Sequence, residues 1–235
     1  MYDVFAKYYD AAEGGMPANF AAWIVKKSRH HGEDPQSLLE LGCGTGGVLA
    51  ALPAQWTKVG VDNSPAMLGV ARAKGLDATL IEHDITTLRL DQRFDVIACV
   101  FDTINHILSP AGWQAVFTTA RAHLSAGGLF LWDMNTSGRL RALADRTPVT
   151  FDVDNATLTM NVTPTQDAQY SWEIVAQDAD GASQREVIGE VAYPLDSARA
   201  MVEKSGFDVL ELDDRNGRDA TDESDRAYFV CRARD

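Results

Sequence analysis

The clearest chemical signal in the chain is a glycine-rich turn that follows a short apolar run ending in Glu40. Four glycines fall within residues 42–47, and the apolar segment 48–52 comes directly after them. Glycine adopts positive φ without strain and puts no Cβ between the backbone and a ligand. The first turn of a helix adds unpaired N–H groups. The pattern therefore predicts a strand, a tight turn and a helix that bind the polar part of a nucleotide-like cofactor.

The glycine spacing fits two kinds of cofactor loop. Residues 42–47 match G-x-G-x-x-G, the fingerprint of dinucleotide-binding proteins. Residues 40–46 match E-x-G-x-G-x-G, the loop of S-adenosylmethionine (SAM) methyltransferases. Asp62 ends the next apolar run and could bind a ribose in either case. The loop alone leaves both cofactors open.

A second group of reactive side chains follows the apolar run 94–101, and its members are Asp102, Thr103, Asn105 and His106. The carboxyl ends of parallel strands are where α/β proteins bind ligands. The unperturbed pKa of His106 lies near neutral pH, so this residue could act as a general base. A structural histidine on the following helix is the alternative.

Aromatic residues near the start of the chain could close the site. Tyr8, Tyr9 and Tyr193 are candidates for lids, because an aromatic face stabilises a sulfonium cation. Packing of the aromatic segment 2–10 against the core is the competing interpretation.

The elements that must position these residues alternate along the chain. Apolar runs at 37–41, 58–61, 78–82, 94–101 and 129–132 are separated by segments with helical spacing or turn residues. Ser64-Pro65 and Ser109-Pro110 have the form of helix starts, and Gly75 and Gly127-Gly128 have the form of helix ends. Alternation of this kind predicts a parallel sheet covered by helices.

The pattern changes in residues 149–193. Polar and apolar residues alternate at 157–162, 170–174 and 186–193, with turn residues between the runs. This spacing predicts antiparallel strands with one solvated face. We expect residues 1–148 and 194–235 to form the cofactor-binding domain. The insert 149–193 would be a lid over the cofactor cleft or a homodimer interface.

Composition limits the class of partner. The chain has 235 residues, with 21 basic against 34 acidic side chains and a net charge of −13. This charge disfavours nucleic acid as a partner. The sequence shows no export signal and no apolar run long enough to span a membrane. The spacing of the three cysteines matches neither a disulfide framework nor a zinc site. We therefore expect a cytoplasmic protein.

The order of the motifs resembles that of the class I SAM-dependent methyltransferases over nearly the whole chain. These motifs are E-L-G-C-G-T-G at 40–46, V-D-N-S-P-A-M-L at 61–68, H-D-I at 83–85, F-D-V-I-A-C-V-F at 94–101, L-S-A-G-G-L-F-L-W-D at 124–133 and E-K-S-G-F at 203–207. The insert and the opening Y-D-x-F-A-x-x-Y-D are similar to the small-molecule branch, which includes glycine and sugar-amine N-methyltransferases. The resemblance implies an α/β Rossmann-like fold with a seven-stranded, mostly parallel sheet, helices on both faces and an inserted antiparallel sheet. Its final strand would be antiparallel.

The resemblance also implies the residues that hold SAM. The glycine loop would contact the methionine part, Asp62 would accept both ribose hydroxyls, and Asp84 would accept from the adenine amino group. The implied cofactor-binding residues are Glu40, Gly42, Cys43, Gly44, Gly46, Asp62, Asn63, Met67, Asp84, Ile85, Val100 and Phe101. His106 and Tyr9 are the candidate catalytic residues. The chain departs from the sugar-amine enzymes at Glu13 and Pro194, where a tyrosine and a histidine would be expected.

We interpret the chain as an enzyme that transfers a methyl group from SAM to a nitrogen or oxygen nucleophile of a small molecule. Such a displacement depends on alignment and needs no metal. A SAM-binding module without catalytic activity is the alternative. An NAD-dependent oxidoreductase is disfavoured, because no tyrosine has a lysine four residues on and Glu40 interrupts the usual apolar strand.

Overall fold

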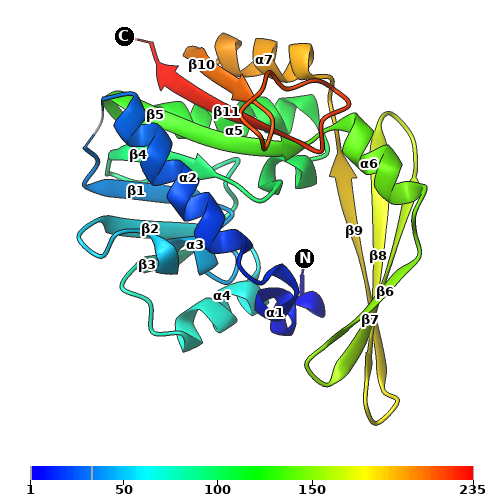
Figure 1. Ribbon diagram of the computed structural model, residues 1–235. Helices are drawn as coiled ribbons and strands as arrows, with labels where there is room; N and C mark the ends of the chain where they lie inside the picture. Colours follow the sequence, from blue (N-terminus) through cyan, green and yellow to red (C-terminus); the bar gives the residue numbers. More distant parts are fainter. Residues whose placement is uncertain (1, 33, 235) are drawn as a thin grey trace.

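The computed structural model describes residues 2–32 and 34–234, which build a large sheet flanked by helices and a separate smaller sheet (Figure 1). The large sheet has seven strands in the order β10-β11-β5-β4-β1-β2-β3. Their bounds are β1 Ser37–Leu41, β2 Thr57–Asp62, β3 Thr79–Glu82, β4 Phe94–Cys99, β5 Leu124–Asn135, β10 Phe207–Asp213 and β11 Arg226–Ala233.

The strand directions confirm the expected class of sheet. Strands β1 to β5 run parallel to one another, whereas the last strand, β11, runs antiparallel to both β5 and β10. The chain order reverses between β1 and β4, which lie side by side in the middle of the sheet. Ligands of open α/β sheets bind beyond the carboxyl ends of the strands at such a reversal.

Helices cover both faces of the large sheet (Figure 1). They are α2 Met16–His30, α3 Gly47–Ala51, α4 Pro65–Ala73, α5 Pro110–His123 and α7 Leu195–Lys204. Phe20 and Ile24 of α2 pack with Leu49 of α3 in one buried cluster. Trp113 of α5 and Val202 of α7 belong to a second cluster on the other face. Each helix thus buries one apolar stripe against the sheet.

The two predicted serine caps start α4 and α5. The Ser64 hydroxyl accepts a hydrogen bond from the N–H of Met67 at 3.3 Å, and the Ser109 hydroxyl accepts one from Gly112 at 3.1 Å. Each cap satisfies one of the free N–H groups of a first helical turn. None of the helices in the described ranges is long and apolar enough to span a membrane.

The insert is a four-stranded antiparallel sheet that follows the short helix α6, Ser137–Ala144. Its strands are β6 Val149–Val153, β7 Ala156–Pro164, β8 Gln169–Asp178 and β9 Ser183–Val191. The apolar side chains of this sheet pack against Phe5 and Tyr8 of the N-terminal segment, which forms the 3₁₀ turn η1 Phe5–Lys7 and the helix α1 Tyr9–Glu13. The insert therefore buries its apolar face against residues from the start of the same chain.

The structure differs from the sequence interpretation at two junctions. Helix α5 ends at His123 and β5 begins at Leu124, so Gly127 and Gly128 lie inside a strand. Gly128 passes so close to β4 that an added Cβ would lie 2.8 Å from the Asp95 carbonyl oxygen. Gly128 thus serves close strand packing, Gly127 supplies a φ of 77°, and neither residue ends the helix. Helix α6 and strand β6 were also missed by the sequence interpretation.

Candidate active site

The glycine loop connects β1 to α3 and has the backbone conformation that its sequence predicts. Gly42, Gly44 and Gly46 have φ values of 77°, 51° and 73°. A Cβ on Gly42 would lie 2.3 Å from the Thr103 side chain, so only glycine fits there. The Asp62 carboxylate accepts the Gly44 N–H at 2.8 Å and the Ser64 N–H at 2.8 Å. The acid at the end of β2 therefore also holds the loop in place.

A cavity opens above this loop at the carboxyl ends of β1, β2 and β4. Most of the residues expected to hold the cofactor line it, and these are Glu40, Gly42, Cys43, Gly44, Asp62, Asn63, Met67, Asp84, Ile85 and Phe101. Gly46 and Val100 are not part of the lining. Gly46 caps α3 with Leu76 packed over its Cα, and Val100 is buried in the sheet core. Their expected contacts with a cofactor are therefore not supported by their positions.

Glu40 provides a test of whether SAM, the expected cofactor, fits this cavity. The side chain is 2% exposed and lines the cavity, and its Oε2 has no hydrogen-bond partner among the described residues. Burial, reinforced by the nearby Asp62 charge, raises the pKa of Glu40 well above its usual range. A buried acceptor without a partner is costly unless a ligand satisfies it. The ammonium group of a SAM methionine part would do so.

Asp84 has a more restricted role than its motif implied. One of its oxygens, Oδ1, accepts hydrogen bonds from the N–H and the hydroxyl of Thr86 at 2.8 and 2.7 Å. The carboxylate therefore shapes its own turn. Its Oδ2 is the oxygen available to an adenine amino group, since Asp84 lines the cavity.

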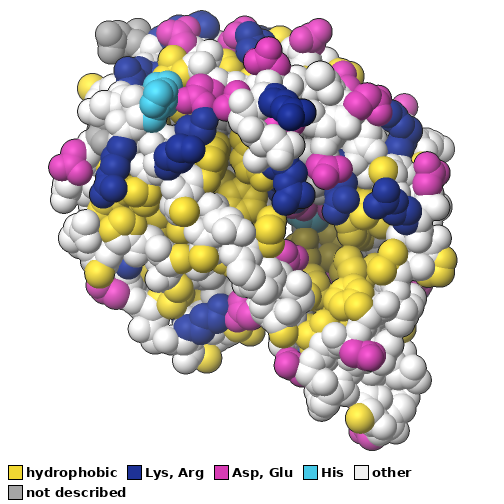
Figure 2. Space-filling model, viewed as in Figure 1, with side chains coloured by type: hydrophobic (Ala, Val, Ile, Leu, Met, Phe, Trp, Pro, Cys, Tyr) yellow, Lys and Arg dark blue, Asp and Glu magenta, His cyan; other side chains and the backbone are white. Residues whose placement is uncertain are grey.

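A second cavity adjoins the first, and Tyr2, Tyr9, Phe101 and His106 line both. The second cavity extends between the large sheet and the insert, whose Trp172, Ile174 and Ile188 form its far wall. Figure 2 shows hydrophobic side chains gathered where the insert, at lower right, meets the main body. A chemical group transferred from a ligand in the first cavity to a ligand in the second would therefore pass beside these four shared side chains.

The backbone after β4 is strained where it reaches this shared wall. Phe101 and Asp102 have φ values of 62° and 51°, which side chains other than glycine rarely adopt. Such strain persists only where the surroundings enforce it, and it clusters at functional sites. The conformation brings Phe101 into both cavities and Asp102 into the second cavity.

The contacts of His106 define its tautomer. Its Nδ1 lies 3.1 Å from the Gly189 carbonyl oxygen, which can only accept, so Nδ1 carries the proton. Its Nε2 accepts from the Tyr2 hydroxyl at 2.8 Å. Burial lowers the pKa of His106, and the nearby Asp102 opposes this only in part. The imidazole is thus neutral, and its basic nitrogen is engaged by a phenol that the sequence analysis did not single out.

Tyr9 and Tyr2 remain phenols in this setting. Burial raises the pKa of both residues well above the usual range of tyrosine, and neighbouring acids raise it further. Neither can therefore act as a base near neutral pH, whereas both can present an aromatic ring or an O–H group. The structure places Tyr9 beside Phe101, with ring centroids 6.4 Å apart.

Acidic side chains line the second cavity, and the sequence analysis named Asp102 and Glu13 but did not single out Glu190. One ligand atom from each of Asp102, His106 and Glu190 lies within 4.8 Å of the other two. Glu190, on β9, is 3% exposed and accepts from the Asn135 amide at 3.1 Å. Burial raises its pKa well above the usual range, and the Asp102 charge adds to the effect. The alternation in 186–193 marked Glu190 only as a strand residue.

Glu13 and Arg226 complete the charges of this cavity. Burial raises the pKa of Glu13 to about 7, with Asp102 adding to the rise and Arg226 opposing it. Arg226, the first residue of β11, binds Asp102 at 2.7 Å and also contacts Asp133. Burial raises the pKa of Asp133 to about 6 despite that contact. The cavity and its surroundings thus combine carboxyl groups that hold protons readily with two partly buried guanidinium groups, those of Arg226 and Arg139.

Comparison with known proteins agrees with this geometry. Residues 38–128 match the family model described as a methyltransferase domain. A dTDP-3-amino-3,6-dideoxy-alpha-D-glucopyranose N,N-dimethyltransferase of Streptomyces fradiae is 31% identical over 128 residues, or 53% of this chain and 50% of that protein. A cypemycin N-terminal methyltransferase of a Streptomyces species is 28% identical over 202 residues, or 83% and 81%. The chain spans about half the length of the sugar-amine relatives it matches.

The whole chain also superposes on solved structures. An S-adenosylmethionine-dependent methyltransferase from Clostridium acetobutylicum aligns with a TM-score of 0.87 at 24% identity, covering 100% of this chain and 99% of the other. The match extends through the N-terminal segment, the insert and the final antiparallel strand. Residues 38–128 therefore match a methyltransferase domain, and the whole chain has the fold of the class I SAM-dependent methyltransferases.

Proposed function

We propose that this chain transfers a methyl group from SAM to an amine nitrogen of a small-molecule acceptor. When bound, SAM supplies a methyl group on a sulfonium, which a nitrogen with a free lone pair can attack. The observation that carries the choice of an amine is the group formed by Asp102, His106 and Glu190 in the second cavity. This group adjoins the wall shared with the cofactor cavity.

The first cavity would hold SAM. Glu40 would accept from its ammonium, because the buried Oε2 has no other partner. Asp62 would accept from the ribose hydroxyls with the lone pairs that its two loop contacts leave free. Asn63, Met67, Asp84 and Ile85 would surround the adenine, and Phe101 would lie beside the methyl group.

The second cavity would hold the acceptor, with its amine against the acidic group. An ammonium donates tetrahedrally to acceptors about 2.8 Å from its nitrogen, which places those acceptors about 4.6 Å from one another. The carboxylates of Asp102 and Glu190 can serve as two such acceptors, since one oxygen of each lies within 4.8 Å of the other. The third member of the group, His106, engages Tyr2 through Nε2 and donates from Nδ1, so it does not accept from the ammonium.

The same group can take the proton that blocks attack. A protonated amine has no lone pair, so one N–H proton must leave before the nitrogen bonds to the methyl carbon. Beside the positive charge of the ammonium, the Glu190 side chain would be held as a carboxylate, and its burial would then make it a stronger proton acceptor than a solvated carboxylate. The guanidinium of Arg226 pairs with one oxygen of Asp102 and balances its charge. We therefore assign Asp102 to orienting the amine. The hydrogen bond from Tyr2 engages the His106 nitrogen, so we assign His106 to positioning.

The insert would form the lid of this cavity and supply acceptor specificity. Trp172 lines the cavity, and its indole N–H is buried without a partner among the described residues. An acceptor hydroxyl or carbonyl would satisfy it. Because the Streptomyces fradiae relative is named for an amino sugar, an amino sugar is the acceptor class we favour. The three free, buried cysteines are compatible with a reducing compartment, and we place the protein in the cytoplasm.

The test begins with binding and then separates enzyme from binding module. Isothermal titration should show that the purified protein binds SAM and S-adenosylhomocysteine. A panel of matched amino and hydroxy compounds, including free and nucleotide-linked amino sugars, is then screened for S-adenosylhomocysteine release. We expect turnover with amines and none with their hydroxy analogues. Tight SAM binding without turnover on any compound would favour a non-catalytic module.

Glu190→Gln tests the assigned proton acceptor. The variant should bind SAM as the wild type does but should lose at least a hundredfold in kcat with the best amine. Glu173→Gln is the matched control, because Glu173 lies on the insert in an exposed ion pair with Arg185. Its turnover should stay within twofold of wild type. Equal turnover for both variants would refute the role of Glu190.

A further inference from the structure

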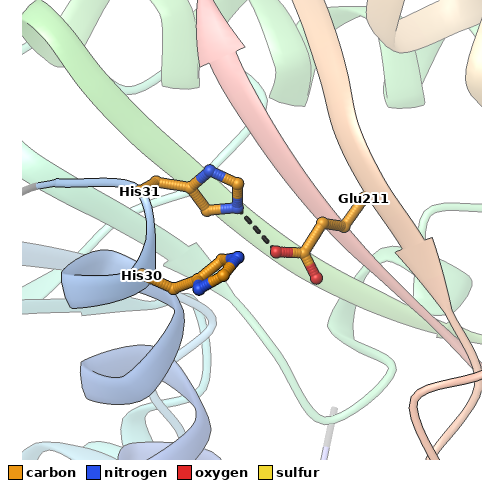
Figure 3. A group of neighbouring side chains, drawn as sticks. All are labelled: His30, His31 and Glu211. Atoms are coloured by element: carbon orange, nitrogen blue, oxygen red, sulfur yellow. Dashed lines mark hydrogen bonds and ion pairs between the residues drawn. The ribbon is translucent and has the colours of Figure 1, made fainter.

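A separate group of potential ligands lies where the end of α2 meets the edge strand β10. His30 and His31 are consecutive at the C-terminal end of α2, and Glu211 projects from β10 toward both rings (Figure 3). One ligand atom from each of the three lies within 4.8 Å of the other two. None of the three lines either cavity of the proposed active site.

The contacts already present orient two of these side chains. The His31 Nε2 lies 2.6 Å from Glu211 Oε1, and the rings of His30 and His31 stand nearly perpendicular with centroids 5.1 Å apart. His30 is exposed, whereas the side chains of His31 and Glu211 are 18% and 17% exposed. His31 and Glu211 are therefore already oriented as ligands, and the exposed His30 side chain can turn toward them at little cost in free energy.

Charged side chains beside the cluster decide which oxygen of Glu211 faces the two rings. Lys27 contacts Oε2 of Glu211 and lies 3.0 Å from Asp213. The Arg232 guanidinium donates to the His31 carbonyl oxygen at 2.8 Å, so the two carboxylates are matched by two cations. Because Lys27 holds Oε2, Oε1 is the oxygen directed toward His31.

We propose that His30, His31 and Glu211 bind a divalent transition-metal ion of the zinc type. Two imidazoles and one carboxylate are a donor set that suits Zn²⁺, with bonds of about 2.0–2.2 Å and a water as fourth ligand. The same set disfavours Mg²⁺ and Ca²⁺, which select oxygen ligands. The ion would replace the bond between His31 and Glu211, so these two atoms would separate to about 3.4 Å as His30 closes the site.

Such an ion would join α2 to the edge of the large sheet. Met16 and Phe20 of the same helix reach the active site, because Met16 lines the second cavity and Phe20 packs against Phe101 with ring centroids 4.6 Å apart. A metal bridge at the far end of α2 would therefore hold one wall of the proposed active site against the sheet. Its role is structural and does not depend on the proposed function.

The test uses untagged, chelator-treated protein and Zn²⁺ alone. Isothermal titration in a chelator-free buffer should show one Zn²⁺ bound per chain, and Zn²⁺ should raise the thermal unfolding midpoint. His30→Ala and His31→Ala should each weaken Zn²⁺ binding at least tenfold and remove the midpoint shift. His83→Ala is the matched control, since it removes a histidine from another part of the chain and should keep wild-type affinity for Zn²⁺.

Two results would overturn the proposal. One is Zn²⁺ binding by His30→Ala and His31→Ala with the affinity of the wild type. The other is loss of binding in Glu190→Gln, which would place the ion in the group of Asp102, His106 and Glu190. His30→Ala keeps the test valid even if His31→Ala fails to fold, because the exposed His30 side chain can be removed without breaking the contacts of His31 and Lys27 with Glu211.

Discussion

Replacing Glu13 by glutamine should change how the stability of the protein depends on pH. Glu13 ends α1, lines the second cavity and has a pKa raised to about 7 by burial, with the Asp102 charge adding to the rise. In the unfolded chain, Glu13 titrates near its ordinary pKa of about 4.5. The native state therefore holds the proton more tightly than the unfolded state. The contribution of protonated Glu13 to the free energy of unfolding is therefore fully present below pH 4.5, and it is lost as the pH rises through about 7.

The size of the effect follows from this shift. A difference of about 2.5 pKa units corresponds to about 3 kcal/mol, and partial exposure of the side chain reduces this to about 1–3 kcal/mol. Glutamine resembles the protonated acid and cannot ionise. Glu13→Gln should therefore match the wild type in unfolding free energy at pH 4.5 and exceed it by about 1–3 kcal/mol at pH 8.

Urea denaturation at pH 4.5, 6 and 8 measures both proteins under the same conditions. Glu82→Gln on β3 is the control for a carboxylate exposed to solvent, and we expect it to change stability by less than about 0.5 kcal/mol at each pH. A stability difference between Glu13→Gln and wild type that is the same at pH 4.5 and pH 8 would refute the assigned titration. Because Glu13 lines the proposed acceptor cavity, the same variant should raise the KM of an amine acceptor.

Two further substitutions test the buried charges. Arg226→Met should lower the free energy of unfolding by about 3–5 kcal/mol, because it removes the shared partner of Asp102 and Asp133. In urea denaturation, adding Asp133→Asn should restore part of this loss. A loss below about 1 kcal/mol would show that the two carboxyl groups are solvated. Glu40→Gln should weaken SAM binding at least tenfold in isothermal titration. It should leave the unliganded fold at least as stable as wild type, because the buried Oε2 has no partner within residues 2–32 and 34–234. Unchanged affinity for SAM in Glu40→Gln would mean that Glu40 does not face the cofactor.

The glycine loop and the helix starts could be predicted because each depends on a few residues close together in the chain. Positive φ at Gly42 and Gly44, and hydroxyl caps at Ser64 and Ser109, follow from the conformational freedom of glycine and from local hydrogen bonds. Alternation of apolar runs with helical segments likewise led to the parallel sheet, because it reflects which faces each element must bury.

Local signals were insufficient where tertiary contacts decide the outcome. The spacing of Gly127-Gly128 indicated a helix end, but both residues lie inside β5, where Gly128 passes close to the Asp95 carbonyl of β4. The alternation in 149–193 predicted an apolar face without saying what covers it. Its cover is the N-terminal segment with Phe5 and Tyr8, which lies far away in the sequence.

The proposed chemistry at the acceptor cavity depends most on tertiary structure. His106 was a candidate from the sequence, but its partners Tyr2 and Glu190 come from the first residues and from the last strand of the insert. No short-range pattern connects segments so distant in the chain. The raised pKa values of Glu13 and Glu190 have the same origin, because burial and neighbouring charges exist only after the insert and the N-terminal segment close over β4 and β5. The sequence by itself determined which residues can form a cofactor loop, whereas only the fold decided which acids meet and which of them hold a proton.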